Sequence, residues 1–255
     1  MTYESRTIKS KWIKTKWLLQ HRELSKYVPH TMLFNKTNLD LMLSLYSSVY
    51  FKPTGGTGGS RIIRIDIKDN GYHIQYNLNK LKFSTPELLF QHLFLFANSQ
   101  SYVLQKGINL TTINKNPFDI RIMVQKTNKG SWVSSAVSVK IGQHGKIVTN
   151  YHQGGTLALF HETMIRAGFD AITTERINIQ LNNIGVATGE HFEKYYNDFK
   201  ELALDVALDV ALDATGYPWI LEVNTRPQIA PLKTLKDQRL YARVLSYAKQ
   251  YGRTK

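Results

Sequence analysis

Residues 49–65, VYFKPTGGTGGSRIIRI, form the stretch that decides the fold. Apolar residues flank a loop from Thr54 to Ser60, which predicts two strands joined by a glycine-rich hairpin. Glycines allow backbone N–H groups to converge on an anion, and the flanking Lys52 and Arg61 would add positive charge. The run lacks the Gly-Lys-Ser/Thr ending of a Walker A loop, and a strand follows where a dinucleotide fingerprint needs a helix. The stretch predicts either a phosphate-binding hairpin or an ordinary flexible hairpin loop.

Outside this hairpin, predicted helices and strands follow one another in an irregular order. Strands are predicted at 72–77, 101–107, 118–126, 132–141 and 219–224, and helices at 36–47, 84–98, 156–168, 175–199 and 234–250. Ser84 and Glu87 form a capping box with Pro86 in the first turn, and Asn38 is a candidate cap for the helix at 36–47. This order predicts an α+β fold with several hairpins and not a regular βαβ alternation.

A local repeat precedes the last predicted strand. The sequence LALDVALDVALD, residues 202–213, places Asp205, Asp209 and Asp213 four residues apart. In a helix this spacing gives a solvated acidic stripe, and in a strand it puts all three carboxylates on one face. The Gly-Tyr-Pro turn and the strand that follow the repeat favour a hairpin.

The strand at 219–224 carries two hard oxygen donors. Glu222 and Asn224 alternate with apolar residues, so both side chains point to one face. Asp209 lies thirteen residues before Glu222, on the partner strand of the supposed hairpin. Carboxylate and amide oxygens on adjacent strands suit Mg²⁺. These three residues predict a magnesium platform, or else a polar strand face without a metal.

A glycine hairpin followed at a distance by an Asp-Glu-Asn set resembles the ATP-grasp superfamily, and in particular the YheC/YheD family of spore coat-associated ATP-grasp proteins. Segments that look like this family occur in order: YVPHT (27–31), VYFKPTGGTGGSRIIRI (49–65), YVLQKGINL (102–110), FDIRIMVQ (118–125), IVTNYHQGG (147–155) and DATGYPWILEVNTRP (213–227). Each motif alone is weak, but their order is specific and covers about residues 11–230. The resemblance implies an ATP-grasp fold, in which two α+β lobes hold ATP between them.

The resemblance also implies a division of the chain and a role for each site residue. Residues 1–30 would be the remnant of an N-terminal region, 31–105 the small lobe with the glycine loop, and 106–255 the large lobe with the metal site. The residues expected to bind ATP are Lys52, Gly55, Gly56, Gly58 and Gly59 at the phosphates and Gln105, Lys106, Gly107 and Ile108 at the hinge. Arg121 and Asn150 would act at the phosphates or the acceptor. Mg²⁺, or Mn²⁺ as an alternative, would be held by Asp209, Glu222 and Asn224.

The sequence departs from the family's pattern at three places. The repeat at 202–213 looks like a family hairpin strand with four extra residues, so Asp209 is the expected metal aspartate and Asp205 the second choice. Relatives have a further N-terminal region, which helps to form the substrate site in ATP-grasp enzymes, whereas this chain begins almost at the ATP-grasp core. Gln153 stands where the family often has a basic residue.

The activity that the resemblance implies is ATP-dependent ligation of a carboxylate and an amine. The carboxylate is activated as an acyl-phosphate that the amine attacks, so no side-chain nucleophile is needed, which fits a chain without cysteine. The alternative is a nucleotide-binding structural or assembly protein of the spore coat that does not catalyse, and the missing N-terminal region favours it. The implied partners are ATP, an unidentified carboxylate and amine, and a protein partner or second copy that covers the cleft.

Composition limits the remaining classes. The chain has 255 residues, of which 42% are apolar and 20% charged, so it can bury a packed core. The net charge of +14 is concentrated at both ends: residues 1–30 carry seven Lys/Arg against two Glu, and 233–255 carry seven against one Asp. This charge suggests an anionic partner, but the ordered ATP-grasp segments argue against nucleic acid. The apolar stretch 88–97 is too short to span a bilayer, and the start lacks a signal-peptide core. We expect a cytoplasmic protein that associates with the spore.

Overall fold

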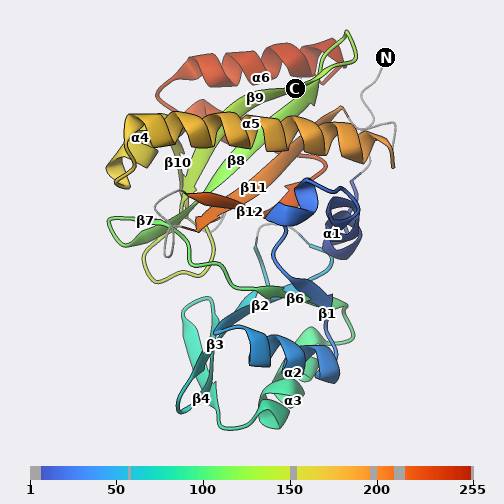
Figure 1. Cartoon of the computed structure of the whole chain (residues 1–255), viewed down its shortest axis with the longest axis vertical. Coiled ribbons are helices and arrows are strands. Elements are labelled where there is room, and N and C mark those ends of the chain that lie inside the picture. The colour runs from blue at the N-terminus through green and yellow to red at the C-terminus, as the bar shows by residue number, and fades with distance from the viewer. Residues whose placement is uncertain (1–6, 57–58, 150–153, 196–199, 210–215, 254–255) are drawn as a thin grey trace.

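A computed structural model of the chain describes residues 7–56, 59–149, 154–195, 200–209 and 216–253, with only the backbone of 207–209. Two antiparallel β-sheets form the centres of two lobes, and each sheet has its own helices (Figure 1). Hairpins and covering helices are arranged as an α+β fold, which confirms that prediction. Among the described residues, none of the helices combines the length and apolarity that a membrane crossing requires.

The small lobe is built on a sheet with the strand order β1-β6-β2-β3-β4-β5. Its elements are β1 (Thr31–Leu33), α2 (Lys36–Leu45), β2 (Ser48–Pro53), β3 (Ile63–Lys68), β4 (Gly71–Tyr76), β5 (Asn79–Phe83), α3 (Pro86–Ala97) and β6 (Tyr102–Lys106). Both helices pack on one face of the sheet, where Leu39, Met42, Leu89 and Leu93 bury completely against Phe51 of β2. Because side chains alternate along a strand, the residues beside Phe51 point to the opposite face of this sheet.

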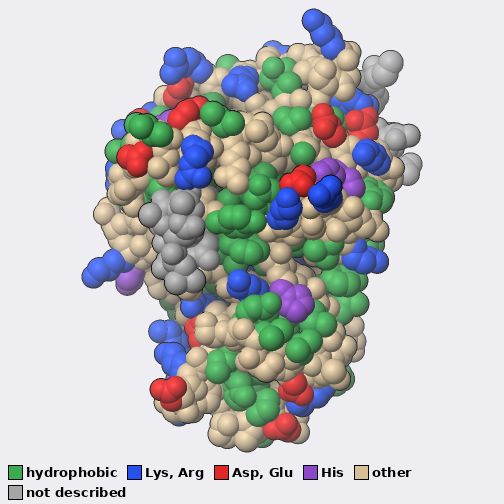
Figure 2. All heavy atoms as spheres, in the orientation of Figure 1, with side chains coloured by type: hydrophobic (Ala, Val, Ile, Leu, Met, Phe, Trp, Pro, Cys, Tyr) green, Lys and Arg blue, Asp and Glu red, His purple; other side chains and the backbone are tan. Residues whose placement is uncertain are grey.

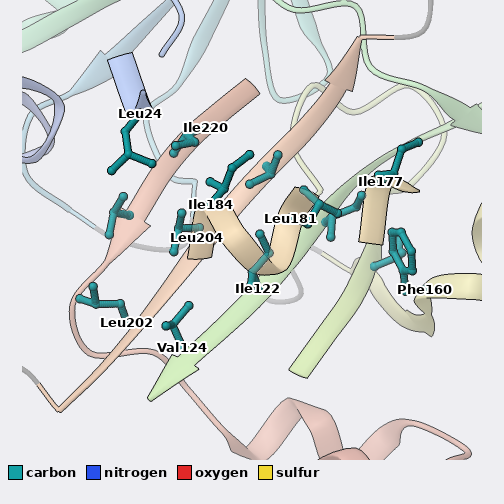
Figure 3. Close-up of a cluster of buried hydrophobic side chains, with 14 of the residues drawn as sticks. Leu24, Ile122, Val124, Phe160, Ile177, Leu181, Ile184, Leu202, Leu204 and Ile220 are labelled. Carbon is teal, nitrogen blue, oxygen red and sulfur yellow. The ribbon is translucent and has the colours of Figure 1, made fainter. Parts of the chain in front are cut away.

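The large lobe is built on a sheet with the order β10-β9-β8-β11-β12. Its elements are β7 (Thr112–Ile113), β8 (Asn116–Lys126), β9 (Trp132–Ile141), β10 (Thr156–Leu159), α4 (Phe160–Arg166), α5 (Ala171–Glu193), β11 (Glu201–Asp209), β12 (Tyr217–Asn224), the short helix η3 (Ala230–Thr234) and α6 (Gln238–Gln250). Helix α5 lies across one face, where Leu181 and Ile184 pack on Ile122 and Leu204 (Figure 3). Met123, which alternates with Ile122, packs beneath α6 on the other face.

The N-terminal segment packs on the large lobe. Helix α1 (Lys11–Leu19) and the short helix η1 (Leu24–Tyr27) bury Leu18 and Leu24 in the same core as α5. The Trp17 ring stacks on Tyr195 with centroids 4.7 Å apart, and the Trp17 carbonyl lies 2.7 Å from His191 Nε2. Residues 8–28 therefore belong to the packed body of the large lobe.

Several element boundaries differ from the prediction for local reasons. The helix predicted at 156–168 is wrong in its first turn, because 156–159 pair with β9 as strand β10 before α4 begins. Helix α3 is capped by Thr85, whose side chain accepts from the Leu88 N–H, and not by Ser84. Asn35 rather than Asn38 caps α2 in the same way. The hairpin interpretation of the repeat is confirmed for 201–209, which pair with β12.

Positive side chains are spread over the face of the molecule that is seen in Figure 2. Figure 2 shows Lys and Arg side chains scattered over this face of both lobes, between acidic and neutral residues, without a continuous basic stripe. Ion pairs join some of these surface charges, as between Lys36 and Asp40 on α2 and between Arg239 and Asp237 at the start of α6. On this face the charge pattern offers no track for a nucleic-acid backbone.

Candidate functional site

A cleft lies between the two lobes, beside the connection from β6 to β8. The open space in it is about 700 Å³, which includes the mouth that is open to solvent. The residues that line it come from both sheets, from loops beside β3 and after β9, from the connection and from α1: Lys11, Tyr50, Lys52, Ile62, Gln105, Lys106, Ile108, Leu110, Asp119, Lys140, Ile147, Val148, Thr149, Asp205, Leu221 and Glu222. Of the predicted site residues, Lys52, Gln105, Lys106, Ile108 and Glu222 are brought together here.

Lys52 enters the cleft because of its place in β2. Its neighbour Phe51 is fully buried in the small-lobe core, so the Lys52 side chain leaves the opposite face of the sheet. Its Nζ donates to Gln105 Oε1 at 2.5 Å and lies 5.2 Å from the centroid of the Tyr50 ring. Gln105 in turn donates to Thr31 Oγ1 at 3.2 Å. Burial lowers the pKa of Lys52 to about 8, although the negative charge of Glu222 opposes this shift.

The predicted glycine hairpin joins β2 to β3. Gly56 has φ +102°, a backbone conformation that favours glycine, and a Cβ added to Gly55 would meet no heavy atom within 4 Å. The Arg61 guanidinium does not point to the loop as expected, since it donates to the Tyr102 hydroxyl at 3.1 Å and to the Phe96 carbonyl. Gly58 lies outside the described residues. The hairpin itself is confirmed, and its binding of phosphate stays a prediction.

The predicted hinge, Gln105 to Ile108, follows directly on the last small-lobe strand. The Lys106 N–H donates to the His30 carbonyl and the Gly107 N–H to the Ser48 carbonyl, both at 2.8 Å. These two donors are therefore engaged within the small lobe. Lys106 Nζ lies 5.0 Å from the centroid of the Trp219 ring on β12, so the side chain reaches across to the large lobe.

Gly107 occupies a position without space for a side chain. An added Cβ would lie 2.5 Å from Ser48 Oγ and 2.9 Å from the Ser48 carbonyl oxygen. We expect Gly107→Ala to lower the free energy of unfolding by about 1–3 kcal/mol, because the Ser48 carbonyl oxygen belongs to the backbone and cannot rotate away. Urea denaturation measures this loss. Gly55→Ala, at an open position, is the spatial control, and equal stability of both variants would contradict the tight packing of the hinge.

The register of the β11–β12 hairpin decides which aspartate lies beside Glu222. Asp205 is opposite Glu222, Ala203 is opposite Asn224, and Asp209 is opposite Tyr217 at the far end of the pair. At about 3.4 Å per residue, the Asp209 backbone lies roughly 14 Å along the strand from Asp205. The Asp209 side chain is outside the description, so its metal role stays a prediction. The residue that the structure places beside Glu222 is Asp205, the second choice.

Asp205 belongs to a buried network of ion pairs. Arg121 donates to both of its carboxylate oxygens at 2.8 and 3.0 Å, and Lys140 bridges it at 3.0 Å to Asp119 at 2.9 Å. Thr149 also donates to Asp119. These residues meet because Arg121 pairs across the strands with Asp205, and Asp119 with Lys140. Asp119 and Lys140 are not among the predicted site residues, although Asp119 alternates with Arg121 on β8.

Burial and the opposite charges in the network shift the pKa values of Asp205, Asp119 and Arg121. Burial acts to raise the pKa of Asp205, but Arg121 and Lys140 outweigh it and hold that pKa well below its ordinary value. Burial raises the pKa of the Asp119 carboxyl in spite of Lys140. Burial also acts to lower the pKa of Arg121, and the Asp205 charge outweighs it and raises that pKa. Arg121, expected at the phosphates, is therefore held by Asp205.

Two lysines that were not predicted reach the site from α1. Lys11 Nζ lies 3.3 Å from Glu222 Oε1, and Lys14 Nζ lies 4.0 Å from the same oxygen. Lys14 is 5% exposed, and burial lowers its pKa to about 8 although Glu222 acts to raise it. Lys11 and Lys14 are three residues apart, a spacing that puts both side chains on one face of a helix. This spacing was the available signal, but the local sequence does not indicate that the helix contacts a strand near the other end of the chain.

The donor set only partly fits a divalent cation. Glu222 and Asn224 project from the same face of β12, opposite the buried Val223, and supply the oxygen atoms that Mg²⁺ prefers. Asn224 Nδ2 also donates to Asp205 at 3.4 Å. Within the described ranges, no group of three or more His, Cys, Asp or Glu residues could hold a metal ion. Asn150, expected near the phosphates, lies outside those ranges.

Comparison with known sequences identifies a family over almost the full chain. The sequence model of the family described as YheC/D like ATP-grasp matches residues 2–254. Endospore coat-associated protein YheD of Bacillus subtilis (strain 168) is 23% identical over 229 residues, which cover 88% of this chain and 49% of YheD. Endospore coat-associated protein YheC of the same strain is 25% identical over 229 residues, which cover 87% of this chain and 61% of YheC. The chain thus spans about half to three-fifths of these relatives.

Solved structures show the same fold at low sequence identity. The C-terminal domain of K. lactis Pby1, an ATP-grasp enzyme that interacts with the mRNA decapping enzyme Dcp2, is similar with a TM-score of 0.55 and 16% identity, covering 96% of this chain and 74% of that one. The ADP complex of purK, N5-carboxyaminoimidazole ribonucleotide synthetase, is similar with a TM-score of 0.52 and 12% identity, covering 94% and 52%. These similarities confirm the ATP-grasp prediction for the fold.

Proposed function

The chain belongs to the YheC/D-like ATP-grasp family, and from this we propose that it binds Mg·ATP in the cleft between its two lobes. The observation that carries the proposal is the position of Lys52, whose ammonium enters the cleft from the small lobe while Glu222 lines it from the large lobe. A triphosphate beneath the glycine hairpin would meet Lys52 at its negative oxygens. The adenine would lie along the hinge from Gln105 to Ile108, between the two sheets.

Glu222 and Asn224 are the residues that we propose to hold Mg²⁺, with Asp209 or Asp205 as the aspartate. A bound Mg²⁺ would neutralise phosphate oxygens and orient the γ-phosphate. The register supports Asp205, and the Arg121 and Lys140 contacts of Asp205 count against it, because a metal would replace part of that network. The variants Asp209→Ala and Asp205→Ala would show which aspartate holds the metal. The variant that lacks the metal ligand should lose magnesium-dependent binding of ATP, and the other variant should keep it.

For activity, we propose ligation of a carboxylate and an amine through an acyl-phosphate as the first candidate. In that reaction Lys52 would stabilise charge on the phosphoryl group, the two lobes would shield the cleft from water, and Asn150 is proposed near the acceptor. The second candidate is a nucleotide-binding structural protein of the spore coat. The locked Arg121–Asp205 pair supports it, because that pair leaves the arginine committed to the sheet. The names of YheC and YheD support association with the spore.

One experiment tests nucleotide binding and activity together. Calorimetry with ATP should give a higher affinity with Mg²⁺ than with a chelator, and equal, negligible heats under both conditions would remove the ATP-grasp site from consideration. Incubation with Mg·ATP and panels of carboxylates and amines should release ADP if the chain ligates. Release of AMP with substrate would overturn the acyl-phosphate mechanism, and absence of either product alongside tight binding would favour the structural role.

The pKa of Lys52 predicts how ATP binding depends on pH. Because that pKa is about 8 and phosphate binds the charged ammonium, affinity for ATP should fall as the pH rises from 7 to 9, and binding at pH 8 should take up a proton. The folded-state pKa lies below the unfolded value of 10.5, so burial of the Lys52 ammonium costs its full amount of stability below pH 8, and this cost is lost as the pH rises from about 8 to 10.5. Calorimetry in buffers of different ionisation heat measures the uptake. Lys52→Arg, which stays charged, should abolish both effects, and an unchanged uptake would assign them to another group.

A further inference from the structure

The carboxylate that the metal would use is already paired with ammonium groups from α1. Lys11 Nζ is 3.3 Å from Glu222 Oε1, and the side chains of Lys11 and Glu222 are 14% and 28% exposed. Lys11 lines the cleft, whereas Lys14, nearly buried, approaches Glu222 at 4.0 Å from behind. Lys11 can therefore reach a ligand in the cleft, whereas Lys14 positions the Glu222 carboxylate.

Lys11 also holds the glycine hairpin. Its backbone N–H donates to the Thr54 carbonyl at 2.6 Å, and its Nζ donates to the Gly56 carbonyl at 3.1 Å. The start of the same segment is fixed to the large lobe, because the Ile8 N–H donates to Thr225 Oγ1 at 2.9 Å. The Lys11 ammonium is thus held between the hairpin proposed for phosphates and the carboxylate proposed for the metal, where a bridging cation would sit.

The net charge around this position favours a polyanion even without a metal. Six cationic side chains and three carboxylates lie in or beside the cleft: Lys11, Lys14, Lys52, Lys106, Arg121 and Lys140 with Asp119, Asp205 and Glu222. The excess is three positive charges when all nine groups are charged. A cleft of low dielectric strengthens the attraction of such an excess for phosphate.

We propose that Lys11 is a phosphate ligand that acts as an intrinsic cation at Glu222, so that this protein binds a triphosphate without a divalent metal and Mg²⁺ competes with Lys11 for the carboxylate. This inference rests on the proposed nucleotide site and adds a residue from outside both sheets. Free Mg²⁺ must displace the ammonium from Glu222. A triphosphate, in contrast, gains a contact from Lys11 as soon as it enters.

The test measures binding of ATP and of inorganic tripolyphosphate by calorimetry, each with a chelator and with Mg²⁺. The wild-type protein should bind both in chelator. In chelator, Lys11→Met should weaken binding of ATP and of tripolyphosphate about tenfold or more, because it removes one charge-assisted hydrogen bond. With Mg²⁺ present, the same variant should weaken binding much less. Mg²⁺ alone should bind Lys11→Met more tightly than wild type. Lys16→Met, on the exposed side of the same helix, is the matched control and should behave as wild type.

Three results would overturn the inference. They are wild-type binding that needs Mg²⁺, unchanged binding of Lys11→Met in chelator, and tighter binding of Lys11→Met under both conditions, which would make Lys11 an obstruction. In each of these the protein still binds Mg·ATP, so the proposed function stands. If the wild-type protein bound ATP neither in chelator nor with Mg²⁺, both the inference about Lys11 and the proposed function would be wrong. Should Lys11→Met lower the melting temperature, Lys11→Gln gives the same comparison with a polar neutral side chain.

Discussion

Replacing Arg121 with alanine is expected to lower the free energy of unfolding by about 3–5 kcal/mol, because it leaves the Asp205 carboxylate buried without its main partner. Asp205 is 6% exposed, and Arg121 satisfies both of its oxygens. Lys140 remains, but it is shared with Asp119 and cannot replace a bidentate guanidinium. Since a domain is stable by only about 5–15 kcal/mol, the variant should melt at a much lower temperature. Urea denaturation measures the loss.

A surface pair provides the control for this prediction. Arg239 makes a similar contact with Asp237, but its side chain is 91% exposed, so Arg239→Ala should leave the free energy of unfolding nearly unchanged. The double variant Arg121→Met with Asp205→Leu should recover stability, because it removes both buried charges. If Arg121→Ala were as stable as the wild type but deficient in turnover, the guanidinium would contact the phosphates, as predicted from the sequence, and would not be required by Asp205.

The second large effect is expected at Lys52. Lys52→Ala should weaken ATP about tenfold to a hundredfold, because a charge-assisted hydrogen bond to phosphate contributes roughly 1.5–3 kcal/mol. Adenosine should bind equally well to both proteins, since the base would lie along the hinge. Loss of the Lys52 charge should not lower the free energy of unfolding. Burial lowers the pKa of Lys52 to about 8, which means that the buried ammonium destabilises the folded protein.

Calorimetry with ATP, ADP and adenosine separates binding from folding at this position. The loss should shrink along that series, as the number of phosphates falls. Lys80→Ala on the exposed strand β5 removes a lysine of the same lobe outside the cleft and should leave all three affinities unchanged. If Lys52→Ala lost adenosine as strongly as ATP, the nucleotide would lie in another orientation or the small lobe would be perturbed.

Local patterns were sufficient to predict most of the fold. The glycine hairpin, the strand with Glu222 and Asn224 and the α3 helix all depend on neighbours in sequence, and the structure contains each of them. The role of Lys52 was predicted from its place beside the glycine loop and from the family resemblance, and the structure shows that it lines the cleft. The short strands β1 and β5 were not predicted, because three to five residues carry little periodicity.

The parts of the site that were not predicted depend on pairing between distant strands and helices. The position of Asp205 beside Glu222 is set by register and by an irregularity between Asp205 and Val206, and a four-residue repeat offers several equivalent registers. The contact of Arg121 with Asp205 needs β8 and β11 to be neighbours. Lys11 reaches Glu222 only because α1 packs against α5 and β12, which the basic N-terminal sequence does not reveal.

The packing of α1 on the large lobe also sets an order of events during synthesis. The small lobe, from β1 to β6, is continuous in the chain and can fold as soon as it leaves the ribosome. The large lobe is discontinuous: its first helix is made before the small lobe, and α5 and β12, on which that helix packs, are made afterwards. Leu18 and the Trp17 ring therefore stay exposed to solvent during translation until α5 and β12 have been synthesised. A protein fused ahead of residue 8 would have to leave this segment free to dock last.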